Sequence, residues 1–217
     1  MKLNHSLAAS MLHALAVLCG LSLLMAVSAV SAEEIAPDVL VKKVSDEVIE
    51  IVRSDADLKA GNTHKATELI EAKVLPHFDF NRMTALSVGR DWRSATPEQK
   101  KLLTNEFHAL LVRTYSNALT AYKDQTIEFK PFKMAPDEND VIVRTQVKQP
   151  GAKPISIDYS LWKNNGTWKV YDVIVGDVSL VISNRDQFKK EISAGGIDGL
   201  IKSLQAKNQT PAASVNK

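Results

Sequence analysis

The stretch WKVYDVIVGDVSLVI, residues Trp168 to Ile182, decides the fold, because it carries apolar side chains on both faces of a predicted strand. Side chains alternate with period two along a strand. Two apolar faces are therefore expected, one with Trp168, Val170 and Ile174 and the other with Tyr171, Val173 and Val175. A strand with one solvated face would instead alternate apolar and polar residues. We expect cover on both sides of this strand, from helices or from the interior of a curled sheet.

Three more predicted strands precede this stretch, in the alternating segments 127–132, 141–148 and 155–162. The connections are short and carry Pro, Gly and Asn, including Asn165-Gly166 just before Trp168, which is typical of tight turns. This order predicts an antiparallel meander of four strands. Gly176-Asp177 is expected to form a bulge or bend, because glycine weakens a strand interior and allows sharp turning.

Helical periodicity dominates the chain before the strands, in residues 37–53 and 63–74 and in a short segment that Asp79 begins and Gly89 ends. Thr96-Pro97-Glu98-Gln99 is typical of a helix start with a capping box, and this helix is expected to run for roughly 26 residues. After Ser183 two further helices are expected, separated at Gly195-Gly196 and ending at Ala206. Helices, then a curled antiparallel sheet, then closing helices predict an α+β domain.

The N-terminus is typical of a cleaved export signal, because an apolar run follows Lys2 and ends in Val30-Ser31-Ala32. A membrane anchor is the alternative. Cleavage after residue 32 would remove the only cysteine, Cys19, and leave a single domain at 33–207 with a disordered tail at 208–217. The 27 basic and 25 acidic residues nearly balance, so no field is expected that would attract nucleic acid or an anionic membrane.

Signatures of catalysis are absent from the sequence: it has no phosphate-binding glycine loop, no G-x-S-x-G and no H-E-x-x-H. Two carboxylates, Asp79 and Asp172, are candidates for a general base, although a helix cap and a backbone-bonded side chain are the commoner roles for such residues. Three arginines near Trp92 suggest either a solvated loop or a phosphate or partner site: Arg82, Arg90 and Arg93. The histidines His64, His77 and His108 lie on different predicted elements, without a second ligand at metal-binding spacing.

Apolar side chains exceed what a single sheet face needs, since the double-sided last strand has aromatic neighbours and faces a long helix. Such a surplus fills a core in most proteins. It also fits an apolar ligand cavity, because curled sheets capped by helices are where such cavities form. The residue pattern leaves both interpretations open.

The chain resembles the MlaC family of periplasmic phospholipid-binding proteins, also called the toluene-tolerance family. The resemblance covers nearly the whole chain after the signal and rests on the order and spacing of these segments: Ser94-Ala95-Thr96-Pro97-Glu98-Gln99 leading to Phe107, Leu111, Tyr115 and Leu119; Trp168 to Asp172; Val178-Ser179; and Gly196-Ile197-Asp198-Gly199-Leu200. It implies a nuclear-transport-factor-like α+β fold, with a curved sheet and helices around a deep apolar pocket. No single motif among these segments specifies the pocket residues.

The resemblance also implies a function without covalent chemistry or cofactor. The protein is expected to be a soluble periplasmic monomer that carries a glycerophospholipid as cargo for an ABC transport system maintaining outer-membrane lipid asymmetry. The expected partners are an inner-membrane MlaD-type transporter complex and an outer-membrane MlaA-type lipoprotein complex. The predicted inward faces give the expected pocket lining: Phe78, Met83, Phe107, Leu111, Tyr115, Leu119, Val143, Val147, Tyr159, Tyr171, Val173 and Val175.

Two other functions fit the same fold. A periplasmic enzyme acting on a hydrophobic substrate would use Asp79 or Asp172 as its base, and ionisable groups should then converge deep in the pocket. A chaperone-like adaptor would instead have a shallow open groove for a partner's hydrophobic segment.

Overall fold

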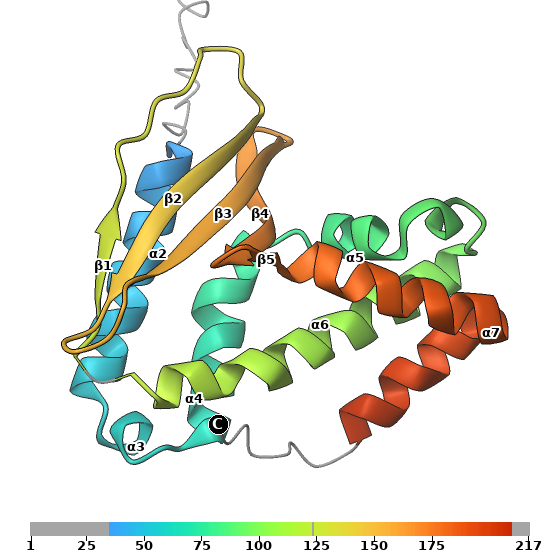
Figure 1. The fold of residues 1–217 in the computed structure, drawn as a ribbon, viewed down its shortest axis with the longest axis horizontal. Coiled ribbons are helices and arrows are strands. Elements are labelled where there is room, and N and C mark those ends of the chain that lie inside the picture. Colours follow the sequence, from blue (N-terminus) through green and yellow to red (C-terminus); the bar gives the residue numbers. More distant parts are fainter. Residues whose placement is uncertain (1–34, 123, 210–217) are drawn as a thin grey trace, which may run out of the picture. The chain divides into compact units, whose positions relative to one another are not determined.

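The computed structural model describes residues 35–122 and 124–209, except for the side chains of Asn117 and Ala118. The predicted export signal, and the tail from residue 210 onward, lie outside the described residues. The described chain has six α-helices, α2 to α7, and a five-stranded antiparallel sheet in the order β1-β2-β3-β4-β5 (Figure 1). The predicted α+β plan is confirmed, with one more strand than expected. None of these described helices combines the length and hydropathy that crossing a membrane requires.

The helices are α2 (Pro37–Ser54), α3 (Ala56–Lys59), α4 (Thr63–Leu69), α5 (Phe80–Val88), α6 (Pro97–Thr120) and α7 (Leu180–Gln209). Three helices, α2, α5 and α6, begin and end close to the predicted positions. Helix α3 was not predicted and lies between the expected helices at 37–53 and 63–74, α4 is shorter than expected, and α7 begins before Ser183. Short π and 3₁₀ segments at Ile70–Val74 and Leu75–His77 join α4 to α5, and a 3₁₀ segment at Gly89–Arg93 follows α5. The capping box of α6 is present: Gln99 N donates to Thr96 Oγ1 at 3.2 Å, and Thr96 N donates to Gln99 Oε1 at 3.0 Å.

The last helix, α7, consists of two helical pieces that meet at Gly196. Gly196 has φ 67° and ψ −169°, a conformation that essentially only glycine adopts, so the predicted break at Gly195-Gly196 is present. The second piece extends to Gln209, beyond the expected domain end at residue 207. Asn208 Nδ2 donates to the backbone oxygen of Glu106 at 2.9 Å, which ties the end of α7 to α6.

The sheet is a meander of β1 (Thr126–Phe129), β2 (Asp140–Lys148), β3 (Ile155–Asn164), β4 (Thr167–Val175) and β5 (Val178–Ser179). The β3–β4 turn is formed by Asn165 and Gly166, both with positive φ, as the Asn-Gly pair predicts for a two-residue hairpin. The predicted single strand from Trp168 to Ile182 is wrong beyond Val175. Gly176-Asp177 forms a turn to the short strand β5, and α7 begins at Leu180.

A β-bulge at Tyr171 changes the phase of β4. Leu161 pairs with Val170, whereas its neighbour Ser160 pairs with Asp172, so Tyr171 is an extra residue in the ladder. The predicted alternation is therefore wrong across this point, because Val170 before the bulge and Val173 after it point to the same face of the sheet. Val173 accordingly packs against the core that contains Val170.

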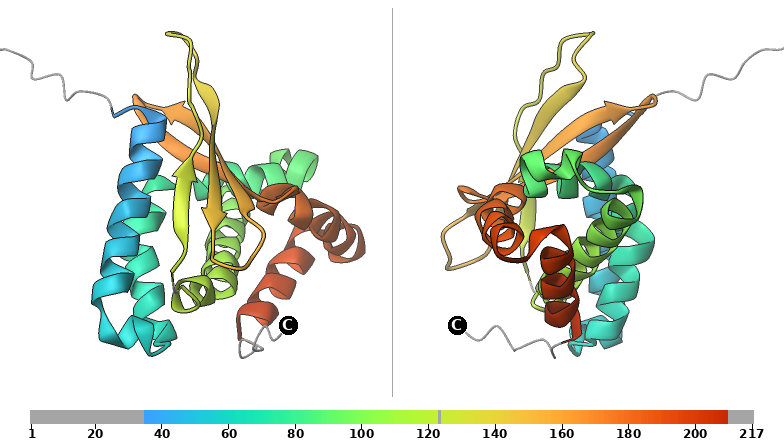
Figure 2. Two further views of the ribbon diagram at one scale, coloured as in Figure 1. Left: turned by 60° about the vertical axis from the view of Figure 1, so that its left-hand side comes forward. Right: turned by 90° about the vertical axis from the view of Figure 1, so that its right-hand side faces the viewer.

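Apolar side chains gather in three places. The helix α2 covers one face of the sheet, where Leu40 and Val41 pack with Val143 and Val170 (Figure 2). Helices α5, α6 and α7 form a second core around Phe107 and Phe188, whose rings meet edge to face at 5.2 Å. A third core joins α2, α3 and α4 through Val48, Val52, Leu58, Ala66 and Leu69.

Candidate functional site: an apolar cavity

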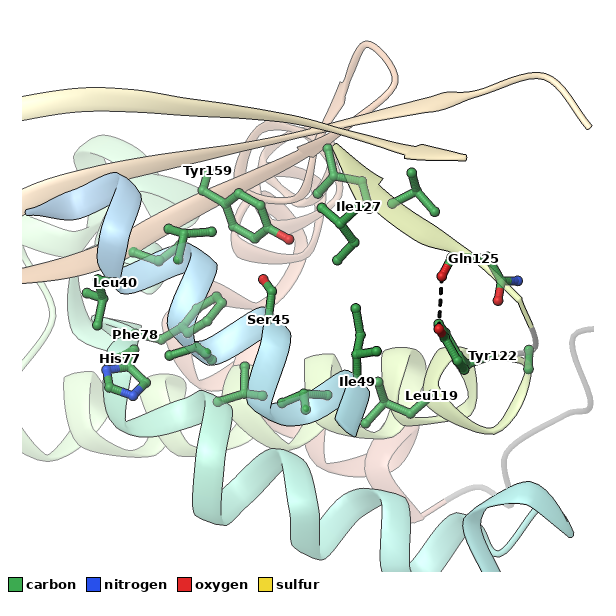
Figure 3. Close-up of a pocket in the computed structure, with 18 residues that line it drawn as sticks. Leu40, Ser45, Ile49, His77, Phe78, Leu119, Tyr122, Gln125, Ile127 and Tyr159 are labelled. Atoms are coloured by element: carbon green, nitrogen blue, oxygen red, sulfur yellow. Dashed lines mark hydrogen bonds between the residues drawn. The ribbon is translucent and has the colours of Figure 1, made fainter. Parts of the chain in front are cut away.

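A cavity of about 450 Å³ lies between α2, the end of α6 and the sheet (Figure 3). Its walls come from these elements: Leu40, Val41, Val44, Ser45, Val48 and Ile49 of α2; Ile127, Val147, Ile157, Tyr159 and Val170 of the sheet; Val74, His77 and Phe78 before α5; and Leu119, Ala121, Tyr122 and Gln125 after the middle of α6. This volume lies in the range of about 300–1,000 Å³ that small-ligand sites usually have.

Most of the apolar side chains around this cavity are only partly buried, including Val44, Ile49, Leu119 and Ile127. They are packed on one side and face the cavity on the other. Hydrocarbon exposed in this way is unfavourable in water, at about 25 cal/mol per Å² of apolar surface. The cavity is therefore suited to an apolar ligand.

The polar groups of the cavity are few and uncharged. Tyr159 is enclosed by apolar neighbours, and burial raises its pKa to about 12. Burial also lowers the pKa of His77, with a further contribution from nearby Lys169, so His77 is neutral at pH 7. The Tyr122 hydroxyl is already engaged, since it donates to the Gln125 backbone oxygen and accepts from Arg53 Nε, both at 2.8 Å.

The two candidate carboxylates hold structure together and do not line the cavity. Asp79 caps α5 by accepting from Arg82 N at 2.9 Å, and it accepts from Trp162 Nε1 at 3.0 Å. Asp172 is buried and accepts from Ser179 Oγ at 2.5 Å and from Val181 N at 3.1 Å, at the start of α7. Both side chains therefore have the structural roles that the sequence suggested as the alternative to catalysis.

Arg82 connects α5 to the sheet and does not line the cavity. Its guanidinium lies 4.3 Å from the Trp162 ring centroid and 4.2 Å from that of Tyr171, and it pairs with Asp140 at 2.8 Å. Two cation–π contacts and an ion pair hold this side chain in place. The sequence suggested that Arg82, Arg90 and Arg93 gather around Trp92. In the structure Arg82 contacts the sheet instead.

The histidines outside the cavity lie on helices and contact neighbouring side chains. His64 lies 3.5 Å from Glu68, and the His108 ring lies 4.5 Å from the Phe80 ring. Among the described residues, no group of three His, Cys, Asp or Glu side chains could hold a metal ion.

Four of the twelve predicted pocket residues line the cavity: Phe78, Leu119, Val147 and Tyr159. Met83, Phe107 and Leu111 lie in the core of α5, α6 and α7. Val143 is buried in the core between α2 and the sheet, and Val173 packs against that core. Tyr171 contacts Arg82, whereas Tyr115 and Val175 are exposed, at 42% and 37%.

Sequence reasoning missed the contribution of α2, which supplies six of the lining residues. The helical stripe was recognised, but none of its residues was included in the expected pocket lining. One signal was present: Ile49 broadens the apolar face of α2 beyond the stripe of Val44, Val48 and Val52. Val170 was also assigned to the face away from the pocket, because strict alternation ignored the bulge.

A family model described as "MlaC protein" matches residues 42–206 of the chain. The chain belongs to the MlaC family. The resemblance seen in the sequence is thereby confirmed. Among curated relatives, the intermembrane phospholipid transport system binding protein MlaC of Haemophilus influenzae is 25% identical over 181 residues, which cover 82% of this chain and 85% of the relative. The toluene tolerance protein ttg2D of Pseudomonas putida is 32% identical over 133 residues, which cover 57% of this chain and 61% of that protein.

A solved MlaC-like structure has the same fold. It is the phospholipid-binding protein from Ralstonia solanacearum in complex with a phospholipid, with a TM-score of 0.74 and 38% sequence identity. The match covers 79% of the present chain and 96% of the Ralstonia chain. The elements that enclose the cavity of this MlaC-family member are therefore arranged as in a protein described with a bound phospholipid.

Proposed function

We propose that this protein binds a phospholipid, with its acyl chains in the cavity beneath α2, and acts as the binding protein of an Mla-type intermembrane transport system. One observation carries the proposal: an apolar cavity of about 450 Å³ in a chain whose fold matches a phospholipid complex. The family relative from Haemophilus influenzae is named for the same transport task. The site lining itself is proposed from the cavity and not from a family motif.

The energetics of lipid transfer explain why such a cavity is useful. Each methylene removed from water contributes about 0.8 kcal/mol, so two acyl chains have a transfer free energy of roughly 20 kcal/mol or more. A lipid therefore does not cross an aqueous compartment alone. A dry protein cavity resembles the bilayer interior, so exchange between the two is close to neutral, and direction must come from the partners.

The cellular setting follows from the predicted export signal. We propose that the mature chain works in the periplasm as a monomer, between an MlaA-type lipoprotein complex at the outer membrane and an MlaD-type transporter complex at the inner membrane. The described helices contain no membrane span, which is compatible with a carrier that moves between two membranes.

The enzyme alternative lacks the ionisable groups that it requires. Members of this family are lipid-binding transport proteins rather than enzymes. No carboxylate lines the described cavity, and Asp79 and Asp172 both have structural hydrogen bonds elsewhere. The lining therefore supports binding of a hydrocarbon and not acid–base chemistry at its floor.

The test is identification of the cargo. Protein purified from its exporting host is analysed by native mass spectrometry, and the extracted lipid is identified. We expect a phospholipid in close to one-to-one ratio with folded protein. Repeated recovery of folded, empty protein that takes up no lipid from vesicles would contradict the proposal.

A further inference from the structure

Two hydroxyl groups project into the apolar cavity from different walls. Ser45 lies on α2 and Tyr159 on β3, and Figure 3 shows both side-chain oxygens directed into the space between helix and sheet. Around them the walls are hydrocarbon, for example Val48 and Ile157. A pair of polar groups in such a wall calls for a physical explanation, because a hydrocarbon ligand that filled the cavity would bury both hydroxyls without a partner.

Neither hydroxyl has a hydrogen-bond partner within the part of the protein that the structure describes. Other hydroxyls in helices donate to the carbonyl four residues earlier, as Thr114 Oγ1 does to Leu110 O at 2.7 Å. Ser45 makes no such bond. The Tyr122 hydroxyl, in the same cavity, has two protein partners. Ser45 and Tyr159 are thus free to bind a group of the ligand.

The chemistry of that group is restricted by the surroundings. A phosphate or an ammonium group would be desolvated here without a counter-charge, since Ser45 and Tyr159 are neutral, and such burial is strongly unfavourable. A hydrocarbon chain alone would leave both hydroxyls unpaired at a cost of about 1–3 kcal/mol each. The ligand group that fits is an uncharged hydrogen-bond acceptor next to hydrocarbon.

We propose that Tyr159 and Ser45 form a specificity site that donates hydrogen bonds to the ester carbonyls linking the acyl chains to glycerol. This inference rests on the proposed function, because a phospholipid carries these carbonyls directly at the head of its chains. The two hydroxyls replace the water that hydrates the carbonyls at a membrane surface. Lipids whose chains are joined by ether links lack the carbonyl oxygen and offer only the ether oxygen, which lies at a different position from the carbonyl oxygen and satisfies the pair less well.

The test compares the two linkages in one experiment. Delipidated full-length mature protein is incubated with vesicles that contain equal amounts of diacyl and dialkyl phosphatidylglycerol with the same saturated chains. The bound lipids are then quantified by mass spectrometry. The wild-type protein is expected to favour the diacyl lipid by about 3- to 10-fold, the effect of one net hydrogen bond.

Removal of the hydroxyls should abolish this preference. In Tyr159→Phe combined with Ser45→Ala, the ratio is expected to fall to one or below, because the carbonyl then leaves hydrated surroundings without a replacement partner. The matched control is Tyr115→Phe, which removes a hydroxyl from an exposed residue outside the cavity lining and should keep the wild-type ratio. Thermal unfolding of each variant verifies that it is folded.

The outcomes separate this inference from the proposed function. A wild-type ratio near one, with lipid bound, would contradict ester recognition and leave lipid binding intact. If the double variant still preferred the diacyl lipid, the assignment of this specificity to Tyr159 and Ser45 would be wrong. Failure of the wild-type protein to take up either lipid would contradict the proposed function itself.

Discussion

At the scale of single residues, Leu119 and Tyr115 differ in role although they lie one turn apart on α6. Leu119 lines the cavity, whereas Tyr115 is exposed and outside the lining. We expect Leu119→Glu to reduce bound lipid tenfold or more, because it places a carboxylate against hydrocarbon. Tyr115→Glu is the matched control and should leave binding within about twofold. Lipid extracted per folded protein measures the difference, and equal losses in both variants would contradict this placement.

His77 should make lipid binding depend on pH. Burial lowers its pKa below the usual value of about 6.5, with Lys169 adding repulsion and Glu47 opposing it. A lipid dries the cavity further, so the bound state should hold the proton less well than the empty state. The empty state then takes up more protons as the pH falls, and lipid affinity decreases from pH 7 to pH 5.

Lipid affinity is expected to decrease roughly threefold or more from pH 7 to pH 5. Lipid uptake from neutral vesicles at each pH measures it. His77→Asn should flatten the profile. His108→Asn is the control, because burial also lowers the pKa of His108 but its ring lies against Phe80 outside the cavity lining. A profile that responds equally to both substitutions would rule out a specific role of His77.

At the scale of elements, two adjacent glycines in α7 have opposite roles. Gly196 has a positive φ that a side chain disfavours, so Gly196→Ala should lower the free energy of unfolding by about 1–3 kcal/mol. Gly195 lies within the helix with open space at its Cβ position, so Gly195→Ala should be neutral or stabilise by up to about 1 kcal/mol. Urea denaturation of the two variants measures this, and similar effects would mean that Gly196 does not set the break.

The bulge in β4 decides which of its residues face α2. It puts Val170 and Val173 on the face beneath α2 and brings Tyr171 to Arg82. With strict alternation, Tyr171 would have lain on the same face as Val173. Helix starts such as that of α6 were predictable, since a capping box involves four neighbouring residues. The bulge was not, because it depends on how β4 pairs with β3.

At the scale of the whole molecule, the empty cavity should lower stability. A ligand that binds only the folded state stabilises it by RT ln(1 + [L]/Kd), about 2.7 kcal/mol at a hundredfold excess over Kd. For a domain of this size, lipid removal should therefore lower Tm by about 5–10 °C. Calorimetry before and after delipidation measures this change in Tm. Leu119→Glu is the control, because its Tm should not respond to delipidation. An unchanged Tm in lipid-loaded wild-type protein would contradict a buried ligand.

The sequence by itself determined the helix and strand segments, the break at Gly196 and the Asn165-Gly166 turn, and its segment order indicated the family. These features depend on interactions within a few residues along the chain. Only the tertiary structure decided that α2 is a cavity wall, that Phe107 and Leu111 are filled core, and that Ser45 and Tyr159 share one cavity. A cavity arises from the spacing between elements. The apolar pattern along one element is the same whether the element that faces it packs directly against it or leaves a gap.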